Sequence, residues 1–216
     1  MITHDIIITT YNSYRYLDNI YEFVFNNIKK YSRIIIVDDC SENKFLAILK
    51  SRLMPFKSII FLETKANLGP SAARNLGIKF SNAEYISFHD PDDYVCKERF
   101  DIISFYIKNF KPKILFHDFT THQLKVEFNN KYKIHSGFIY LFKSLYVTPA
   151  FTCKRVLLEE IGGYDENIRY AEDLDLYIKL KTLHNFFFIN QKLVRISNKE
   201  ERTQNNNHLS SNLNLM

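Results

Sequence analysis

A chain of 216 residues and 25.7 kDa can bury one hydrophobic core without disulfides or a structural metal. Hydrophobic residues make up 46% of the chain and charged residues 25%, an ordinary composition that excludes extensive disorder. The net charge of +5 favours anionic partners such as nucleotide diphosphates or phospholipids, but the basic residues are dispersed among Asp and Glu, which argues against nucleic-acid binding.

Strands and helices alternate in the first half of the chain. Apolar, β-branched runs predict strands at 5–9, 33–37, 58–62 and 84–88, each followed by a helical pattern, at about 14–30, 44–52, 71–80 and 97–110. This alternation predicts an α/β fold with a doubly wound, mainly parallel sheet flanked by helices. Ligands bind beyond the carboxyl ends of such strands, so the four loops after them are expected to line one crevice.

The second half is less regular. Strand-like pieces at 114–119 and 123–128 precede a poorly patterned aromatic stretch, then helices at about 154–161 and 171–183 and a last strand at 192–197. We expect one domain over residues 1–198. The Asn-rich segment 199–216 is expected to be a partly disordered polar tail, because it offers little apolar surface to bury.

Compartment and membrane association are the next inferences. The three cysteines lie far apart without CxxC spacing, and the N-terminus lacks a basic segment followed by a long apolar stretch. A zinc knuckle, a disulfide framework and export are therefore not indicated. The longest apolar stretch, 138–147, falls short of the roughly 20 residues that span a bilayer. We expect a cytoplasmic protein without a membrane span.

Three carboxylates crowd into four residues directly after the strand at 84–88. They are Asp90, Asp92 and Asp93 in the sequence DPDD. Their mutual repulsion is relieved by a bound cation, and oxygen ligands of this kind suit Mg²⁺ or Mn²⁺. The alternative is a turn or a helix N-cap, where Asp is also common.

Three further sets of polar residues carry candidate chemistry. Asp38 and Asp39 follow the second strand, where a carboxylate can accept bonds from ribose hydroxyls or from a base; the alternative is a solvated loop that caps the next helix. Arg74, in the third helix, can meet phosphate or ribose or be an ordinary surface cation. Glu172 and Asp173 lie at a predicted helix start, where the helix dipole favours an ionised Asp173 that can accept a proton. The alternative is that the two acids only complement the dipole of the helix terminus.

Five blocks in this order resemble the family 2 glycosyltransferases of the GT-A fold. They are TTYNS at 9–13, VDDCS at 37–41, NLGPSAARN at 67–75, DPDD at 90–93, and IGGYDE at 161–166 followed by Glu172 and Asp173. Their order and spacing cover about residues 4–197, which is more specific than any single motif. The resemblance implies a nucleotide-sugar-binding half at about 1–112 and an acceptor-binding half at 113–198.

The resemblance also implies roles for individual residues. Tyr11 is expected against the nucleotide base, Asp39 on the base or the ribose, and Arg74 on the nucleotide. The complete implied sets are Thr9, Tyr11, Asp39, Asn67, Arg74 and Asp90 for the donor; Asp92 and Asp90 for Mn²⁺ or Mg²⁺, with Asp93 nearby; and Asp173 with Glu172 for catalysis. The implied reaction is a single inverting displacement in which Asp173 takes the proton of the acceptor hydroxyl.

The implied donor is a nucleotide diphosphate sugar, with UDP favoured over GDP or dTDP. The implied acceptor is a glycan or a lipid-linked glycan in bacterial polysaccharide or lipopolysaccharide synthesis, at the cytoplasmic face of the inner membrane. Many members carry a histidine after the last strand in a segment that closes over the diphosphate, whereas this chain reads RISNK at 195–199. A lid role for Arg195, Lys199 or Arg202 is the corresponding hypothesis, and acceptor binding is expected to involve a partner, a homodimer or a lipid surface.

Other classes fit less well. A sugar nucleotidyltransferase normally has a Gly-rich basic loop after its first strand, whereas this chain has TYNSY at 10–14. The GxGxxG of dinucleotide-dependent oxidoreductases and the GxxxxGK[ST] of P-loop kinases are both absent from the sequence. A degenerate member that binds nucleotide sugar without turnover remains the non-enzymatic alternative, although the presence of Asp90, Asp92 and Asp173 argues against it.

Overall fold

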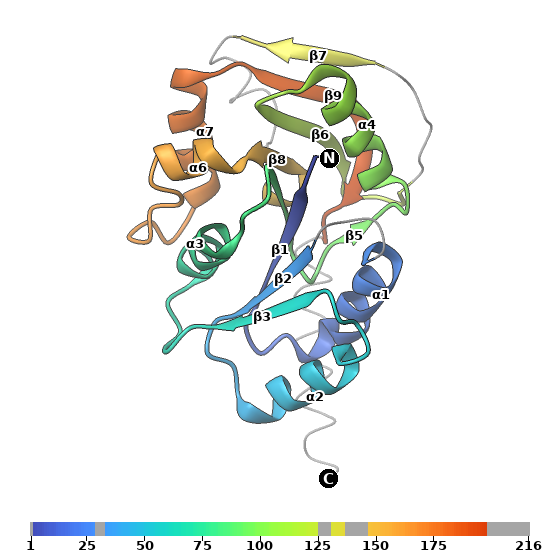
Figure 1. Ribbon diagram of the computed structural model, residues 1–216, viewed down its shortest axis with the longest axis vertical. Helices are drawn as coiled ribbons and strands as arrows, with labels where there is room; N and C mark the ends of the chain where they lie inside the picture. The colour runs from blue at the N-terminus through green and yellow to red at the C-terminus, as the bar shows by residue number, and fades with distance from the viewer. Residues whose placement is uncertain (1, 29–32, 125–130, 137–146, 198–216) are drawn as a thin grey trace.

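The computed structural model describes residues 2–28, 33–124, 131–136 and 147–197, which form a nine-stranded sheet with helices on both faces (Figure 1). The strand order is β3-β2-β1-β4-β8-β6-β9-β5, and β7 also pairs with β9. The strands are β1 (His4–Thr10), β2 (Arg33–Asp38), β3 (Ile59–Glu63), β4 (Tyr85–His89), β5 (Tyr94–Val95), β6 (Ile114–Thr120), β7 (Tyr132–His135), β8 (Phe151–Lys154) and β9 (Phe186–Arg195).

Six α-helices in the described part of the chain cover the two faces of the sheet (Figure 1). On one face pack α1 (Leu17–Asn27), α2 (Asn43–Leu53) and α4 (Arg99–Phe110), and on the other α3 (Pro70–Phe80), α6 (Arg155–Glu160) and α7 (Glu172–Leu183). Short 3-10 turns lie at Tyr14–Tyr16 and Thr148–Ala150. None of these helices is long and apolar enough to cross a membrane.

Strands β1, β2 and β4 run parallel and are buried on both sides. β1 lies between β2 and β4, and the side chains of β1 alternate between the two helical layers: Ile6 and Ile8 join one core, and Ile7 joins the other. This arrangement explains the uninterrupted apolar runs, because a strand covered by helices on both faces needs apolar residues at every position. Each buried Ile contributes about 1.5–3 kcal/mol.

Beyond β4 the sheet becomes mixed. β8 pairs antiparallel with both β4 and β6, and β9 runs parallel to β6 but antiparallel to β5 and β7. The predicted α/β class with helices flanking the sheet is confirmed. Strands β5, β7 and β8 were not predicted, because strands of two to four residues carry too few positions to show a period.

Other boundaries differ from the predictions. β9 begins at Phe186 instead of 192, since the run FFF at 186–188 has no alternation to separate it from the preceding helix. The piece predicted at 123–128 forms no strand in its first two residues, and its remainder lies outside the described residues. The tail at 199–216 and the expected helix end at 29–30 lie outside them too.

Helix α3 lies very close to β1. A Cβ atom on Gly77 would lie 2.8 Å from Ile7 Cγ2, so only glycine allows this approach. The close packing sets the position of α3 relative to the sheet, and with it the position of Arg74 one turn earlier on the helix.

Candidate active site

Asp38 organises the turn after β2. Its Oδ1 accepts hydrogen bonds from the hydroxyls of Thr10 (2.9 Å) and Ser41 (2.6 Å), and its Oδ2 accepts from the Ser41 backbone N–H (2.7 Å). These contacts tie the loops after β1 and β2 together. Asp38 therefore has a structural role in this turn.

Asp39 holds a different loop. Its Oδ1 accepts bonds from Thr64 Oγ1 (2.8 Å) and the Leu68 N–H (3.0 Å), and its Oδ2 accepts from the Gly69 N–H (2.7 Å). The side chain is buried, with 4% of Asp39 exposed, so the solvated-loop alternative is wrong. A carboxylate has about four acceptor sites, and these three bonds leave capacity for one more.

Arg74 joins two predicted motifs. Its Nη1 donates to Glu172 Oε1 (2.9 Å), its Nη2 pairs with Asp90 Oδ1 (3.3 Å), and its guanidinium lies 5.3 Å from the ring centroid of Tyr164. Only 6% of Arg74 is exposed, so the surface-cation alternative is wrong. Burial alone would lower the pKa of Arg74, but Asp90, Tyr164 and Glu172 together raise it, so the arginine stays charged.

The glycine-rich block after α6 is fastened to α3 by Asn75. Its Oδ1 accepts from the Tyr164 N–H (2.8 Å), and its Nδ2 donates to Tyr164 O (2.9 Å) and Glu166 Oε1 (2.8 Å). Gly163 has φ +73°, and a Cβ atom there would lie 2.4 Å from Asn75 Oδ1. The glycine therefore permits the contact that brings Tyr164 against Arg74.

The DPDD loop at 90–93 is held from several elements. The Asp93 N–H donates to the Asp90 carbonyl (3.1 Å) and closes a turn, and Asn19 of α1 donates to the Pro91 carbonyl (3.3 Å). The turn alternative is thus correct for the backbone, and it does not exclude a ligand role for the carboxylates. Asp90 and Asp92 are both partly exposed, whereas Asp93 is buried.

The carboxylate oxygens of Asp90 and Asp92 fit a divalent cation of the expected kind, Mg²⁺ or Mn²⁺. Within the described residues, no three His, Cys, Asp or Glu side chains are arranged as a complete metal site. Mg²⁺ and Mn²⁺ are commonly held by one or two carboxylates together with phosphate oxygens of a substrate, and Asp90 and Asp92 are two partly exposed carboxylates of this kind. Arg74 beside Asp90 offsets part of the negative charge.

Asp173 is the second residue of α7, next to Glu172 of this cluster. Its Oδ1 accepts from the Leu174 N–H (2.8 Å). Burial raises the pKa of Asp173 above its ordinary value, and Glu172 adds to the rise, while the Leu174 N–H and Arg74 oppose it. The expectation from the helix dipole alone had the opposite sign, because it ignored desolvation. A carboxyl with a raised pKa is better suited to accept a proton near neutral pH.

Direct contacts join only some of the residues that were expected to bind the sugar donor. Arg74, Asp90, Glu172 and Asp173 form one cluster, and Asp39 positions the loop that carries Asn67. Thr9 and Tyr11 lie at the carboxyl edge of β1, where Tyr11 is 52% exposed, and the described contacts do not join them to the cluster. Three residues had no role assigned from the sequence, Asn75, Tyr164 and Ser197, although all three fall within quoted segments.

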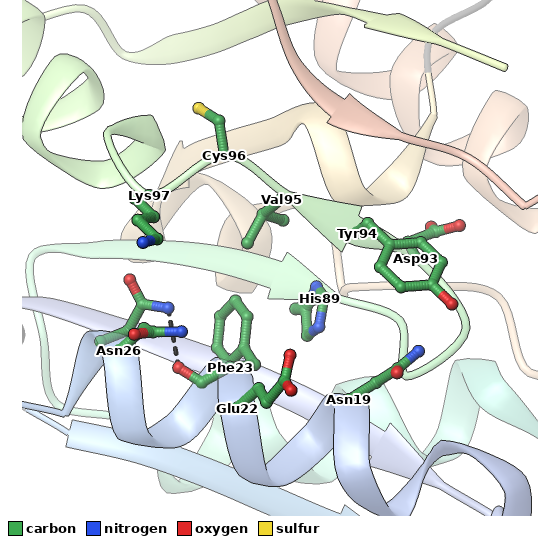
Figure 2. Close-up of a pocket in the computed structure, with 11 residues that line it drawn as sticks. Asn19, Glu22, Phe23, Asn26, His89, Asp93, Tyr94, Val95, Cys96 and Lys97 are labelled. Carbon is green, nitrogen blue, oxygen red and sulfur yellow. Dashed lines mark hydrogen bonds between the residues drawn. The ribbon is translucent and has the colours of Figure 1, made fainter. Parts of the chain in front are cut away.

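Two hollows flank the site. A cleft of about 400 Å³ lies between residues 67–71 and the segment containing Glu166 and Arg169, a size in the range of small-molecule pockets. A cavity of about 80 Å³ lies between α1 and β5 and is lined by His89 and Phe23 (Figure 2). Burial and then the Arg99 charge lower the pKa of His89, so this residue is neutral. The smaller cavity is too small for a nucleotide sugar.

Comparison with known proteins gives the family. Residues 5–165 match the model described as Glycosyl transferase family 2. The chain belongs to this family. Glu172 and Asp173 lie beyond the matched residues of the family 2 model. The place of Glu172 in the site rests on its hydrogen bond with Arg74, and that of Asp173 on its position next to Glu172 in α7.

Several glycosyltransferases are similar in sequence. An uncharacterized glycosyltransferase of Rickettsia felis is 31% identical over 210 residues, which cover 91% of this chain and 34% of that protein. The poly(ribitol-phosphate) beta-N-acetylglucosaminyltransferase TarS of Staphylococcus aureus is 32% identical over 105 residues, 45% of this chain and 18% of TarS. The chain spans about a third of the length of three curated relatives, two from Rickettsia and one from Haemophilus influenzae.

Solved structures share the fold. The crystal structure of S. aureus TarS 1–349 in complex with UDP-GlcNAc superposes with a TM-score of 0.75 at 18% identity, covering 92% of this chain and 59% of that one. TarS 1–349 in complex with UDP gives a TM-score of 0.74 at 17% identity, covering 92% of this chain and 61% of that one. This likeness establishes the glycosyltransferase fold of the chain.

Proposed function

We propose that this family 2 member transfers a sugar from a nucleotide diphosphate sugar, a UDP-sugar in the first instance, to an acceptor hydroxyl with inversion. The observation that carries the proposal is the buried Arg74, which contacts both Asp90 of the DPDD loop and Glu172 of the acid pair. One guanidinium thereby brings a candidate diphosphate-binding loop next to a candidate base, as transfer from a diphosphate donor requires. The fold shared with TarS, which was solved with UDP-GlcNAc, supports the donor class.

The donor is proposed to lie across the carboxyl edge of the first three strands. The exposed ring of Tyr11 offers a stacking surface for the base, and the remaining acceptor site of Asp39 suits a base N–H or a ribose hydroxyl. Asn67 lines the 400 Å³ cleft next to this edge, and Thr9 is the second-last residue of β1. Ligands of α/β sheets bind in this position.

We propose that Mn²⁺ or Mg²⁺ binds at Asp92 and Asp90. When bound, a divalent cation offsets the charge that grows on the departing diphosphate. The chain contributes the two carboxylates, and the contact with Arg74 orients Asp90. DPDD thus acts as a DxD motif in this proposal.

Asp173 is the proposed base. Its carboxylate accepts the proton of the acceptor hydroxyl as the oxygen attacks the anomeric carbon, and no covalent sugar intermediate is needed. The raised pKa favours this proton transfer, while Arg74 beside it opposes full neutralisation. Glu172 holds Arg74 in place and is proposed to act through it.

The acceptor is proposed to be a bacterial surface glycan or its lipid-linked precursor. Two relatives carry names of this type, TarS and the minor teichoic acid biosynthesis protein GgaB of Bacillus subtilis, which is 32% identical over 111 residues covering 50% of this chain and 12% of GgaB. Lipopolysaccharide is the alternative product class. We place the reaction at the cytoplasmic face of the inner membrane, with peripheral attachment or a homodimer completing the acceptor site.

The test is the thermal stability of the purified protein with UDP, GDP, dTDP and their sugar conjugates, each with Mn²⁺ and with chelator. A ligand of the native state raises the melting temperature by mass action. A rise that requires Mn²⁺ and is selective for one nucleotide sugar is expected. Asp92→Asn should remove this rise, whereas Asp101→Asn, an exposed acid on α4, should keep it. No rise with any ligand in folded wild-type protein would refute donor binding.

A further inference from the structure

Asp93, the third acid of the DPDD loop, is hydrogen-bonded to the segment just after the last strand, β9. Asp93 Oδ1 accepts a hydrogen bond of 3.0 Å from the backbone N–H of Ser197, and the Ser197 hydroxyl donates to the carbonyl of Asp92. Asp93 is 3% exposed. A carboxylate in this position relieves an N–H group that is itself buried, and a buried N–H without a partner is costly.

Neighbouring contacts continue the same connection along both segments. β5 pairs antiparallel with β9, Tyr94 opposite Arg195 and Val95 opposite Val194, and the Arg195 guanidinium lies 4.3 Å from the Tyr94 ring centroid. The Cys96 N–H then donates to Leu193 O (3.1 Å). Residues 92–96 are thus joined continuously to residues 193–197, about one hundred positions later in the chain.

The orientation of Asp93 follows from this pairing. Figure 2 shows Asp93 beside Tyr94 at the start of β5, with its carboxylate turned away from α1. Asp90 faces Arg74 on α3, and Asp92 offers its backbone carbonyl to Ser197 while its side chain stays partly exposed. The three acids of the loop therefore differ in their surroundings, and only Asp93 is buried against β9.

We infer that Asp93 is a positioning residue that, with Ser197, fixes the DPDD loop to the segment just after β9. In this inference Asp93 does not bind the cation. The effect on donor binding rests on the proposed function. Asparagine preserves the acceptor oxygen that the Ser197 N–H requires but removes the charge that a metal ligand supplies. The two roles therefore predict opposite results for Asp93→Asn.

The first experiment measures the affinity for UDP with Mn²⁺ by calorimetry in wild type, Asp93→Asn, Asp93→Ala and Asp92→Asn. Asp93→Asn should stay within about threefold of wild type, whereas Asp93→Ala should bind about tenfold more weakly, as loss of a hydrogen bond to a charged group implies. Asp92→Asn should lose the Mn²⁺-dependent binding. If folded Asp93→Asn binds as poorly as Asp92→Asn, Asp93 is a ligand and the inference is wrong.

The second experiment is independent of any ligand. Hydrogen exchange of peptides covering 93–97 and 192–197 should quicken in Asp93→Ala and stay near the wild-type rate in Asp93→Asn. Ser197→Ala should quicken exchange at 92–95, and Ser197→Thr, which keeps the hydroxyl, should restore it. Unchanged exchange in Asp93→Ala would overturn the inference. If the variants show the expected exchange changes but the wild type does not bind UDP, the proposed function is refuted and the positioning role of Asp93 stands.

Discussion

The buried Arg74 on α3 and the partly buried Glu172 at the start of α7 form an ion pair of 2.9 Å that spans 98 positions of sequence. The same guanidinium reaches Asp90 at 3.3 Å. The pair links the two halves that the sequence analysis separated into donor-binding and acceptor-binding parts. The ion pair therefore affects both the stability of the fold and the geometry of the site.

Replacing Arg74 by methionine should lower the free energy of unfolding by about 3 kcal/mol or more, because two carboxylates would be left without their cation. Arg74→Lys should recover part of this loss, since a lysine supplies the charge but not a planar fork for two partners. Urea unfolding measures both. Arg52→Met is the matched control, because its pair with Asp18 is exposed and should contribute far less. Equal losses at both arginines would contradict the buried role of Arg74.

Asp173→Asn should leave UDP binding intact and lower transfer by orders of magnitude. In wild type, the active form of the base is deprotonated, so the rate should fall as pH drops through the raised pKa of Asp173. This acid limb should lie above the range of an ordinary aspartate and should vanish from the residual activity of the variant. Near-normal turnover by Asp173→Asn would assign the base elsewhere.

The raised pKa of Asp173 also has a sign for stability. Because the folded-state pKa is above the unfolded value, protonation favours the folded state, and the contribution of this group to stability rises as pH falls. Asp173→Asn should therefore not destabilise the protein at pH 7, and a small gain is expected. Thermal unfolding of both proteins across pH 4–8 checks this sign. A clear loss of stability in the variant at pH 7 would show that the ionised form is favoured in the folded state.

Gly162 and Gly163 allow a paired test. Both have positive φ, +79° and +73°, but a side chain at 162 would meet open space, whereas one at 163 would meet Asn75 Oδ1. Gly162→Ala should cost about 1 kcal/mol from backbone strain, and Gly163→Ala should cost clearly more, about 2–3 kcal/mol. Denaturant unfolding compares them. In the Asn75→Ala background, where the clashing side chain is already gone, Gly163→Ala should cost no more than Gly162→Ala. A larger cost in that background would show that the clash is with another group.

Asp39→Asn should lower the free energy of unfolding by about 1–3 kcal/mol even without nucleotide. The asparagine amide can supply only one carbonyl oxygen, so its NH₂ group would face either Gly69 N–H or the two donors at Oδ1. Chemical denaturation in the absence of ligand measures this loss. An unchanged stability would mean that Asp39 serves the donor alone.

The sequence by itself determined the first half of the fold. The apolar, β-branched runs at β1, β2 and β4 follow from burial on both faces, and the helices after them follow from local periodicity. It also placed Asp39, Asp90 and Asp173 at strand ends and a helix start, because those positions depend only on where an element ends. The family resemblance rested on the same local blocks, and the family model confirms it.

Only the tertiary structure decided which partner each charged group meets. Nothing near Arg74 in sequence announces Glu172, and nothing near Asp93 announces Ser197, since these contacts cross 98 and 104 positions. The short strands β5, β7 and β8 were invisible for a related reason, because their stability comes from neighbours in the sheet and not from a pattern of their own. Local order is written in periodicity, whereas the environment of a side chain exists only once distant segments have packed.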